Sequence, residues 1–260
     1  MGALTGKKGI ILGVGNQRSI AWAVAEHFHK EGAELALTYL IDPKGRFEAN
    51  VKKLGQKVNA TMIKDCDVAS NDSICSLIKS LNNHWGELDF LIHSLAFAEQ
   101  KDLQKEFSCT TREGFAKAHE ISAFSLLPLV EGVAPMMKNK GGGSIISMSF
   151  IGSNLAVPHY HVMGPAKASL EASSRYLARE LGPDNIRVNV VSSGAIKTLS
   201  SAGIKDFAEL MRVGAEHSAM KRTVTQEEVA QTTLFLASEA SSGITGQVIY
   251  VDCGYSIMAN

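Results

Sequence analysis

The chain alternates short apolar runs with longer segments in which apolar residues recur at helical spacing. The first apolar run, Lys7–Gly13 (KKGIILG), ends in glycine. In Ile20–Gly32 the mainly apolar positions 20, 23, 24, 27 and 28 form one face, which predicts an amphipathic helix that stops at its final glycine. Ala33–Leu40 (AELALTYL) is predicted to be a second strand. The opening of the chain is therefore predicted to be a βαβ unit.

The same alternation continues to the end of the chain, with irregular stretches expected at Ala96–Thr111 and over most of 196–221. Strands separated by helical segments are typical of a parallel sheet covered by helices on both faces. We therefore predict an α/β fold, a Rossmann-like doubly wound parallel sheet, in a single domain covering residues 1–260. The further predicted strands are Val58–Ile63, Leu88–His93, Ser144–Met148, Ile186–Val191 and Gln247–Val251. The further predicted helices are Arg46–Leu54, Asn71–His84, Glu113–Leu127, Leu129–Met137, Ala168–Leu181, the amphipathic piece Asp206–Val213, and Glu227–Leu236.

The predicted strand ends are the expected place for a ligand. In a parallel sheet the ends at Gly13, Leu40, Asp67 and Ser94 would lie along one edge, where such folds bind ligands. The turn Gly13–Ser19 (GVGNQRS) precedes a helix whose free N–H groups favour an anion such as a pyrophosphate. The third glycine of the GxGxxG pattern is absent, and any tight strand-to-helix turn can use two glycines. The turn alone therefore leaves dinucleotide binding and a structural role equally open.

Tyr160 and Lys167 are the candidate catalytic pair. Seven positions correspond to nearly two helical turns, so one helix covering both residues would place them on the same face. Spacing alone equally describes an exposed tyrosine and a solvated lysine. Pro165 lies between them, and proline fits only the first helical turn. We therefore expect the helix to begin near Gly164, with the tyrosine on the approach to it.

Composition narrows the class of protein. The 260 residues are 45% hydrophobic and 20% charged, as expected for a packed globular chain. Lysine plus arginine balance aspartate plus glutamate at 26 each, which argues against a general nucleic-acid binder. The four cysteines form no CxxC pair and no metal-like cluster with histidine. We expect no metal, no signal peptide, no membrane span and a cytoplasmic location.

Taken together, these features resemble the short-chain dehydrogenase/reductase superfamily. The details are closest to one branch, the enoyl-acyl carrier protein reductases of bacterial fatty-acid synthesis, and the resemblance covers essentially the whole chain. The interval between tyrosine and lysine is specific to that branch. The matching runs are GVGNQRSIA at Gly13–Ala21, KEGAELALTY at Lys30–Tyr39, CDVA at Cys66–Ala69, HSLAFA at His93–Ala98, TREGF at Thr111–Phe115, YHVMGPAKASLEA at Tyr160–Ala172, IRVN at Ile186–Asn189, KTLSSAGIKDF at Lys197–Phe207, RTVT at Arg222–Thr225 and GQVIYVDCGYSI at Gly246–Ile257.

The carbonyl-reducing triad of ordinary superfamily members is not matched in either register. Those members place the tyrosine four residues before the lysine and a serine thirteen before the tyrosine. Counted from Lys167, these places hold Met163 and Phe150, which cannot donate a proton. Counted from Tyr160, Ser147 fits but the lysine comes three residues late. A 3-ketoacyl or other carbonyl reductase is therefore the second hypothesis, and a non-catalytic nucleotide-sensing protein the third.

The resemblance implies reduction of a trans-2-enoyl thioester by NADH, with Tyr160 donating a hydrogen bond to the enolate oxygen and Lys167 holding the nicotinamide ribose. Many bacterial relatives carry a second tyrosine where this chain has Phe150, so we expect only a pocket wall there. For Asp67, a competing interpretation is that it caps a helix. For Ile20 and Leu95, the competing interpretation is packing in the core. The implied cofactor-binding residues are Gly13, Ser19, Ile20, Asp67, Val68, Ser94, Leu95, Lys167, Ile196, Lys197, Thr198, Leu199 and Ser200. The implied substrate residues are Ala98, Phe150, Tyr160, Met163 and Phe207.

Residues at the end of the second strand indicate whether the cofactor carries a 2′-phosphate. A 2′-phosphate needs a cation there, whereas NAD usually meets an acid about 20 residues past the glycine turn. Thr38–Ile41 offers neither, which favours NADH, and Arg18 and Arg46 are the residues that would reverse this. The 196–213 segment is expected to cover the cofactor, and Ala202–Val213, with Met211, to form an acyl pocket.

The resemblance also implies an acyl carrier protein as the bearer of the substrate, and a homotetramer. Lys205, Arg212, Lys221 and Arg222 are candidates for contact with that acidic partner. Glu209 and Glu216 are interleaved with them, so a solvated mixed-charge face explains the same residues.

Overall fold

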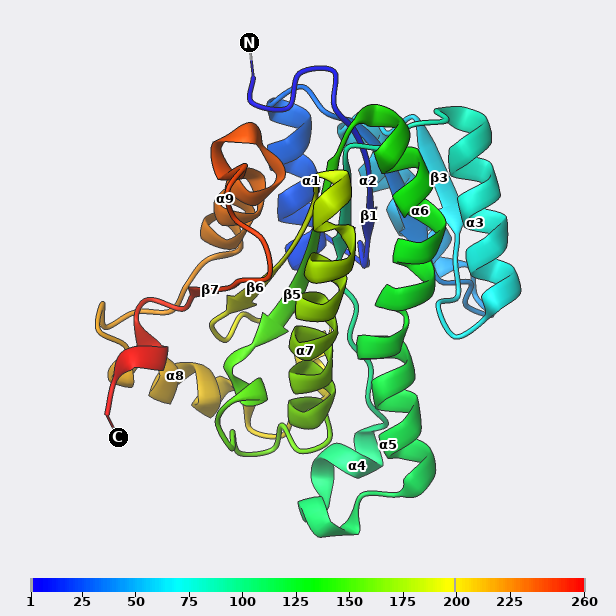
Figure 1. The fold of residues 1–260 in the computed structure, drawn as a ribbon. Coiled ribbons are helices and arrows are strands. Elements are labelled where there is room, and N and C mark those ends of the chain that lie inside the picture. Colours follow the sequence, from blue (N-terminus) through cyan, green and yellow to red (C-terminus); the bar gives the residue numbers. More distant parts are fainter. Residues whose placement is uncertain (1, 199, 260) are drawn as a thin grey trace.

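The computed structural model describes residues 2–198 and 200–259, and its centre is one parallel β-sheet (Figure 1). The strand order is β3-β2-β1-β4-β5-β6-β7, and every neighbouring pair is parallel. The order reverses between β1 and β4, as in a doubly wound sheet. The predicted α/β, Rossmann-like fold is confirmed. The strands are β1 Lys8–Leu12, β2 Glu34–Tyr39, β3 Met62–Asp65, β4 Phe90–His93, β5 Gly143–Phe150, β6 Ile186–Ser193 and β7 Val248–Val251.

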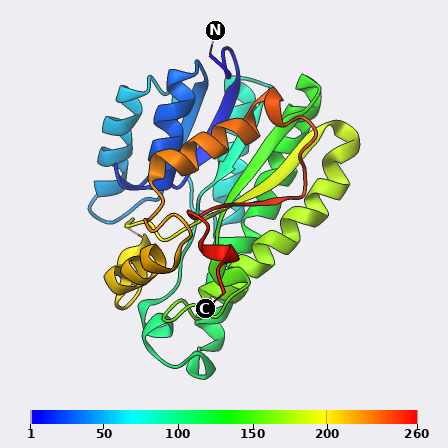
Figure 2. The same cartoon turned by 90° about the vertical axis from the view of Figure 1, so that its left-hand side faces the viewer.

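Helices cover both faces of the sheet, and local sequence signals set where several of them begin (Figures 1 and 2). Ser70 caps α3 by accepting a hydrogen bond from the Ser73 amide, and Thr225 forms a full capping box with Glu228 at α9. Pro165 lies in the first turn of α7, as predicted. The helices are α1 Ile20–Lys30, α2 Arg46–Lys57, α3 Asn71–His84, α4 Gln100–Gln104, α5 Arg112–His119, α6 Leu126–Lys140, α7 Met163–Leu181, α8 Phe207–His217 and α9 Gln226–Ala237.

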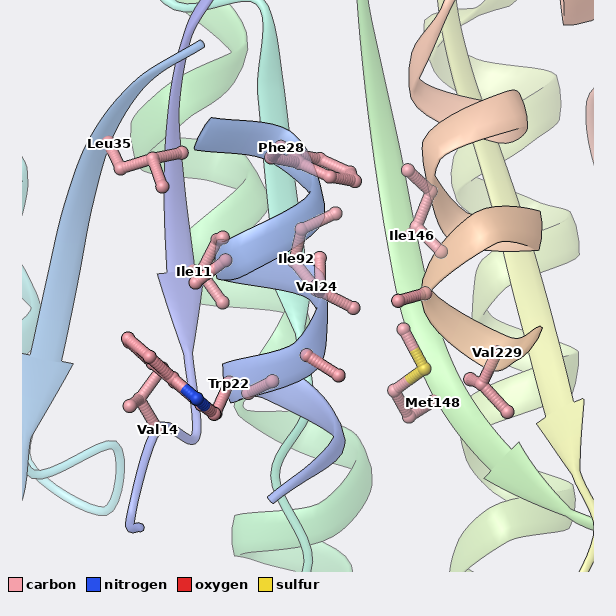
Figure 3. Packing of buried hydrophobic residues seen from close by; sticks show 14 of the residues in the cluster. Ile11, Val14, Trp22, Val24, Phe28, Leu35, Ile92, Ile146, Met148 and Val229 are labelled. Atoms are coloured by element: carbon pink, nitrogen blue, oxygen red, sulfur yellow. The ribbon is translucent and has the colours of Figure 1, made fainter. Parts of the chain in front are cut away.

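Apolar side chains pack on each face of the sheet. On one face, α1 and α9 lie against β1, β4 and β5 (Figure 3). Phe28 of α1 meets Phe90 of β4 edge to face, with ring centroids 4.9 Å apart. The opposite face carries α3, α6 and α7. Since both faces are covered, β1, β2 and β4 are buried along most of their length and do not alternate between buried and exposed residues.

One apolar helical run corrects an expectation. Within the described residues, Arg112–Lys140 has the length and mean hydropathy of a membrane span, although none was expected. Over half of its most apolar window, 56%, is buried inside the protein. Leu126, Leu129 and Val133 of this run are fully buried in the core under the sheet. The run is therefore apolar because it is a core helix.

The predicted boundaries differ from the structure at several elements. The third strand lies at Met62–Asp65 and not at Val58–Ile63, because α2 continues to Lys57 and Asn59 then turns the chain at φ 48°. The expected break between two helices at position 128 is replaced by a π-helical turn at Glu120–Phe124. Ala96–Thr111 contains α4 and a short 3₁₀ turn.

The carboxyl ends of the strands face a group of loops and short helices. α4 and α8 both lie beyond this edge, far from the N-terminus (Figures 1 and 2). β5 and β6 extend two residues past their predicted ends, to Phe150 and Ser193, and are paired to the last residue. This extension carries cavity-lining residues beyond the rest of the sheet.

Candidate active site

A cavity of about 530 Å³ opens at the carboxyl ends of β1, β4, β5 and β6. Its wall comes from segments that are far apart in the sequence, including the turn after β1 and the chain after β6. Most of the predicted site residues line it. These are Gly13, Ser19, Ile20, Ser94, Leu95, Ala98, Phe150, Tyr160, Met163, Lys167, Ile196, Thr198 and Phe207.

The remaining predicted site residues are not brought into this cavity. Asp67 follows β3 at the same sheet edge, where it is exposed, and its carboxylate accepts a hydrogen bond from the Ala69 amide at 3.0 Å. The alternative that Asp67 caps a helix is wrong, because Ser70 caps α3. Val68 is half-buried, Lys197 is exposed, and neither lines the cavity. Leu199 and the side chain of Ser200 lie outside what the structure describes.

Tyr160 is held between the end of β5 and the start of α7. It lies three residues before α7, so the two-turn geometry of a single helix does not apply, as the position of Pro165 indicated. Its ring meets the ring of Phe150 at a centroid distance of 4.8 Å and an angle of 60°. Burial raises the pKa of its phenol, and the charge of Glu171 raises it further. The hydroxyl therefore stays protonated and able to donate a hydrogen bond.

Lys167 projects from the second turn of α7 and is buried beside the same cavity. Its ammonium donates to the carbonyl of Met148 at 2.8 Å and to that of Leu95 at 3.2 Å. Those carbonyls belong to β5 and to the chain just after β4, so the lysine ties two neighbouring strand ends together. Burial lowers its pKa to about 8, against the opposing effect of Glu171. A buried ammonium with these partners fits the predicted cofactor contact.

The turn after β1 is shaped for close approach of a ligand. Gly13 has φ +97°, and a Cβ there would collide with the carbonyl oxygen of Ser94. Ser19 donates its hydroxyl to the Asn16 carbonyl and does not cap α1. The first turn of α1 also holds no acidic residue. Its N-terminal amides and dipole therefore face the cavity without a competing charge, which suits a pyrophosphate.

The 196–213 segment borders the other side of the cavity. Thr198 and Ser201 exchange hydrogen bonds of 2.9 to 3.2 Å, which close a tight turn at the cavity wall. Phe207, the first residue of α8, lines the cavity. Met211 does not, which corrects the predicted acyl pocket. It lines a separate cavity of about 30 Å³ that shares Phe150 with the first.

Sequence reasoning missed several cavity residues. Leu103 of α4 and Ile204 of the 196–213 segment join Tyr160 and Met163 in one apolar cluster. Leu103 is in a segment expected to be irregular, where no periodicity marks a buried face. Ile204 lies within the predicted acyl-pocket range 202–213 but was not singled out there. Gly15 also lines the cavity, and its place as the second glycine of the turn after β1 was a signal that could have identified it. The other missed lining residues are Ala96, Phe97, Gln100, Met148, Ser149, Ser193, Gly194, Ala195, Ser201 and Gly203.

The end of β2 presents apolar side chains. Leu40 and Ile41 are 50% and 70% exposed. Asp42, the nearest acid, accepts hydrogen bonds from the amides of Lys44 and Phe47 at 3.0 and 2.8 Å. The guanidinium of Arg46 lies 3.9 Å from the same carboxylate. Arg46, named as a possible partner of a 2′-phosphate, is therefore close to an acid that would compete for it, although the arginine side chain is 76% exposed.

Comparison with known proteins supports the resemblance. A family model described as Enoyl-(Acyl carrier protein) reductase matches residues 13–256. The enoyl-(acyl-carrier-protein) reductase (NADH) FabI of Nostoc sp. is 49% identical over 255 residues, or 98% of either chain. The protein of the same name from Neisseria meningitidis serogroup B is 45% identical over 260 residues, covering 100% of this chain and 98% of its own.

Solved structures agree over the whole chain. The crystal structure of the enoyl-(acyl-carrier-protein) reductase (NADH) from Aquifex aeolicus has a TM-score of 0.95 and 39% identity, and it covers 100% of both chains. The reductase from Anaplasma phagocytophilum, solved in complex with NAD, has a TM-score of 0.94 and 37% identity, covering 100% of this chain and 97% of its own. By sequence and by fold, the chain belongs to the enoyl-acyl carrier protein reductase family of short-chain dehydrogenases/reductases.

Proposed function

We propose that this protein is an NADH-dependent enoyl-acyl carrier protein reductase, which reduces trans-2-enoyl thioesters to saturated acyl thioesters in fatty-acid elongation. The observation that carries the proposal is the meeting of Tyr160 and Lys167 in one buried cavity beside the open N-terminus of α1. The relative from Nostoc and the relative from Neisseria both have NADH in their names. Family membership and site geometry therefore point to the same reaction.

Tyr160 would stabilise the enolate that forms during reduction. A nicotinamide bound here would supply a hydride to the β-carbon, leaving negative charge on the thioester oxygen until the α-carbon takes up a proton from solvent. A buried phenol that keeps its proton can donate a hydrogen bond where this charge forms. Phe150 packs against the ring of Tyr160 and limits how it can turn. The donor is thus held ready before the substrate arrives.

The other residues would bind and orient the two reactants. The amides at the N-terminus of α1 suit the pyrophosphate, and Lys167 suits the ribose hydroxyls of the nicotinamide half. Asp67 and Val68, at the end of β3, are proposed for the adenine, since a carboxylate can accept from its exocyclic amine. Ala98, Met163 and Phe207 offer apolar contact for the acyl chain. The 196–213 segment is proposed to close over both ligands.

The positions of the candidate serines do not support the carbonyl-reductase alternative. Ser147 stands thirteen residues before Tyr160, but its side chain is fully buried in the core and its hydroxyl has no hydrogen-bond partner. Ser149, two residues later, is the serine that lines the cavity, and its hydroxyl already donates to Glu171. Neither serine is placed as the substrate donor that ketone reduction by this superfamily requires.

A pairwise assay tests the proposed function. Purified protein with a crotonyl thioester is expected to consume NADH, seen as falling nicotinamide absorbance, at a kcat/KM at least tenfold above that with NADPH. The exposed apolar end of β2 and the pairing of Arg46 with Asp42 disfavour a 2′-phosphate, and the exposed Arg18 is the cation that would reverse this preference. Turnover of a 3-ketoacyl thioester without turnover of the enoyl thioester would replace this proposal with the carbonyl reductase. Binding of NADH with no turnover of either would support a nucleotide sensor.

Restoring the family's second tyrosine tests the role of Phe150. Its ring walls the cavity and packs on Tyr160, and the wild-type side chain has no proton to give. We therefore expect Phe150→Tyr to change kcat by less than about threefold, because the oxyanion donor is already present. Phe150→Ala is the control, and it should lower kcat by releasing the ring of Tyr160. A tenfold rise in kcat for Phe150→Tyr would show that the wild type lacks a proton donor.

Ion pairs in and near α8 reduce the number of basic residues that are proposed to contact the acyl carrier protein. Arg212 is held by Glu209 and Glu216 at 2.6 and 2.5 Å, and Arg222 by Glu228 at 2.6 Å. These arginines are already neutralised, so we propose Lys205 and Lys221 as the main contacts to an acidic carrier. We also propose a cytoplasmic homotetramer without membrane or nucleic-acid partners, which light scattering would test as a mass of about four chains.

A further inference from the structure

Three consecutive residues at the end of β5 each contact a different member of the site. The carbonyl of Met148 accepts from Lys167, and the ring of Phe150 packs on Tyr160. Between them, the hydroxyl of Ser149 donates to the carboxylate of Glu171 at 2.5 Å. The proposed mechanism uses the first and the last of these contacts and leaves the middle one unexplained.

Glu171 is unusual in being a buried acid beside the cavity wall. It lies one helical turn after Lys167 on α7, so the two side chains share a face. Its side chain is only 5% exposed. Burying a carboxylate is costly unless it is hydrogen-bonded and meets an opposite charge. Ser149 supplies the hydrogen bond. Lys167, on the same face of α7, supplies an opposite charge that acts from beyond ion-pair distance, since its ammonium bonds to the two carbonyls instead.

The titratable groups near Lys167 and Glu171 come from α7, from the segment just before it, and from β4 and β7. On α7, Glu171 opposes the effect of burial and raises the pKa of the ammonium. On β4, His93 is buried with a pKa lowered to about 3, so it adds no positive charge near neutral pH. The phenol of Tyr160 keeps its proton because burial and Glu171 both raise its pKa. On β7, Tyr250 also has its pKa raised, mainly by burial, and stays neutral. Among these groups, Glu171 is the only carboxylic acid.

We propose that Glu171 is a positioning residue, which acts with Ser149 to fix α7 against the end of β5 and to keep Lys167 as an ammonium ion at working pH. This deepens the proposed function and rests on it. Without the carboxylate, the buried lysine loses its proton at lower pH. The sign follows from the charges: an acid nearby favours the protonated amine, so its removal lowers the pKa of Lys167.

The pH profile of kcat/KM distinguishes this role from a purely structural one. For Glu171→Gln we expect the alkaline midpoint to fall by about one pH unit, since a nearby opposite charge commonly shifts a pKa by one to three units. Above both midpoints this amounts to a loss of about tenfold. Glu171→Asp keeps the charge and should restore most of the shift. Glu180→Gln removes an exposed acid from the same helix and should leave the midpoint unchanged.

Ser149→Ala separates the hydrogen bond from the charge. It is expected to lower kcat/KM by a similar factor at all pH values, with a smaller movement of the midpoint than Glu171→Gln. If Glu171→Gln lowers activity equally at every pH, or shifts the midpoint no more than Glu180→Gln does, the proposal is wrong. Melting temperatures of each variant show whether the comparison is between folded proteins.

A second measurement needs no turnover. In the free protein, the signal of ¹³C-labelled Lys167, identified by its loss in Lys167→Arg, can be titrated by NMR. A lower pKa in Glu171→Gln supports the positioning role even if the enoyl thioester is not the substrate. An unchanged pKa overturns it even if the enzyme assay succeeds. Failure of the proposed function and failure of this inference are therefore distinguishable.

Discussion

Tyr160→Phe is expected to lower kcat for enoyl-thioester reduction by about 10²–10³, the usual cost of removing one oxyanion donor. The phenol is buried beside the cavity, and its raised pKa keeps the proton available for donation. Phenylalanine keeps the ring that packs on Phe150, so the shape of the site should survive. Steady-state assays of NADH consumption measure kcat, and quenching or enhancement of nicotinamide fluorescence measures the affinity for NADH.

The affinity for NADH is the control in this experiment. Lys167 and the turn after β1 are unchanged in Tyr160→Phe, so Kd should stay within about threefold of wild type. Phe150→Leu offers a matched change of the neighbouring ring without loss of a donor, and its effect on kcat should be much smaller. A normal kcat with a much weaker Kd would contradict the assignment and make Tyr160 a cofactor-binding residue.

Gly13→Ala is expected to have the second large effect, on both stability and NADH binding. The backbone at Gly13 has φ +97°, which disfavours any side chain, and a Cβ would also collide with the carbonyl of Ser94. Strain of this kind costs about 1–3 kcal/mol before the collision is counted. Relief requires β1 and β4 to move apart at the strand ends that form the cavity. We expect a clear loss in urea unfolding free energy and at least tenfold weaker NADH binding.

Gly45→Ala is the matched control for this prediction. Gly45 also has a positive φ, +62°, but a Cβ there would have open space around it. It caps α2 outside the cavity lining, so only the backbone strain should appear, with NADH affinity unchanged. If both alanine variants lose the same unfolding free energy and both bind NADH normally, the close approach of Gly13 to the Ser94 carbonyl contributes nothing to stability or NADH binding.

The fold could be predicted because its signals are local. Strand and helix periodicities, the stop at Gly32 and the position of Pro165 each depend on neighbours within a few residues. The third strand was misplaced because Val58–Ile63 is apolar enough for a strand, yet α2 continues to Lys57, immediately before it, and the chain then turns at Asn59. Local propensity favoured both structures there, and packing of Val58 in the core decided between them.

The site was predicted more fully where a motif marked it than where packing alone built it. Thirteen of the predicted residues line the cavity, and all of these except Phe150 and Ile196 belong to runs matched in the family. Leu103 and Ile204 reach the same cluster from segments without periodicity, and Met211 turns into a different cavity. The rotation of a helix about its axis depends on the surface it meets, which no local pattern records.

The sequence by itself determined the alternating elements, the parallel sheet, the glycine turn and the identity of the tyrosine and lysine, since each follows from residue type and spacing. Tertiary structure alone decided how these parts act together. It placed the carbonyl of Met148 on Lys167, the ring of Phe150 on Tyr160, and Ser149 on Glu171. These contacts join β5 to side chains 10 to 22 positions away, and burial, followed by the charge of Glu171, shifts the pKa values of Tyr160 and Lys167. Burial and contact are properties of the packed chain, so the chemistry of the pair emerges only when β5 and α7 meet.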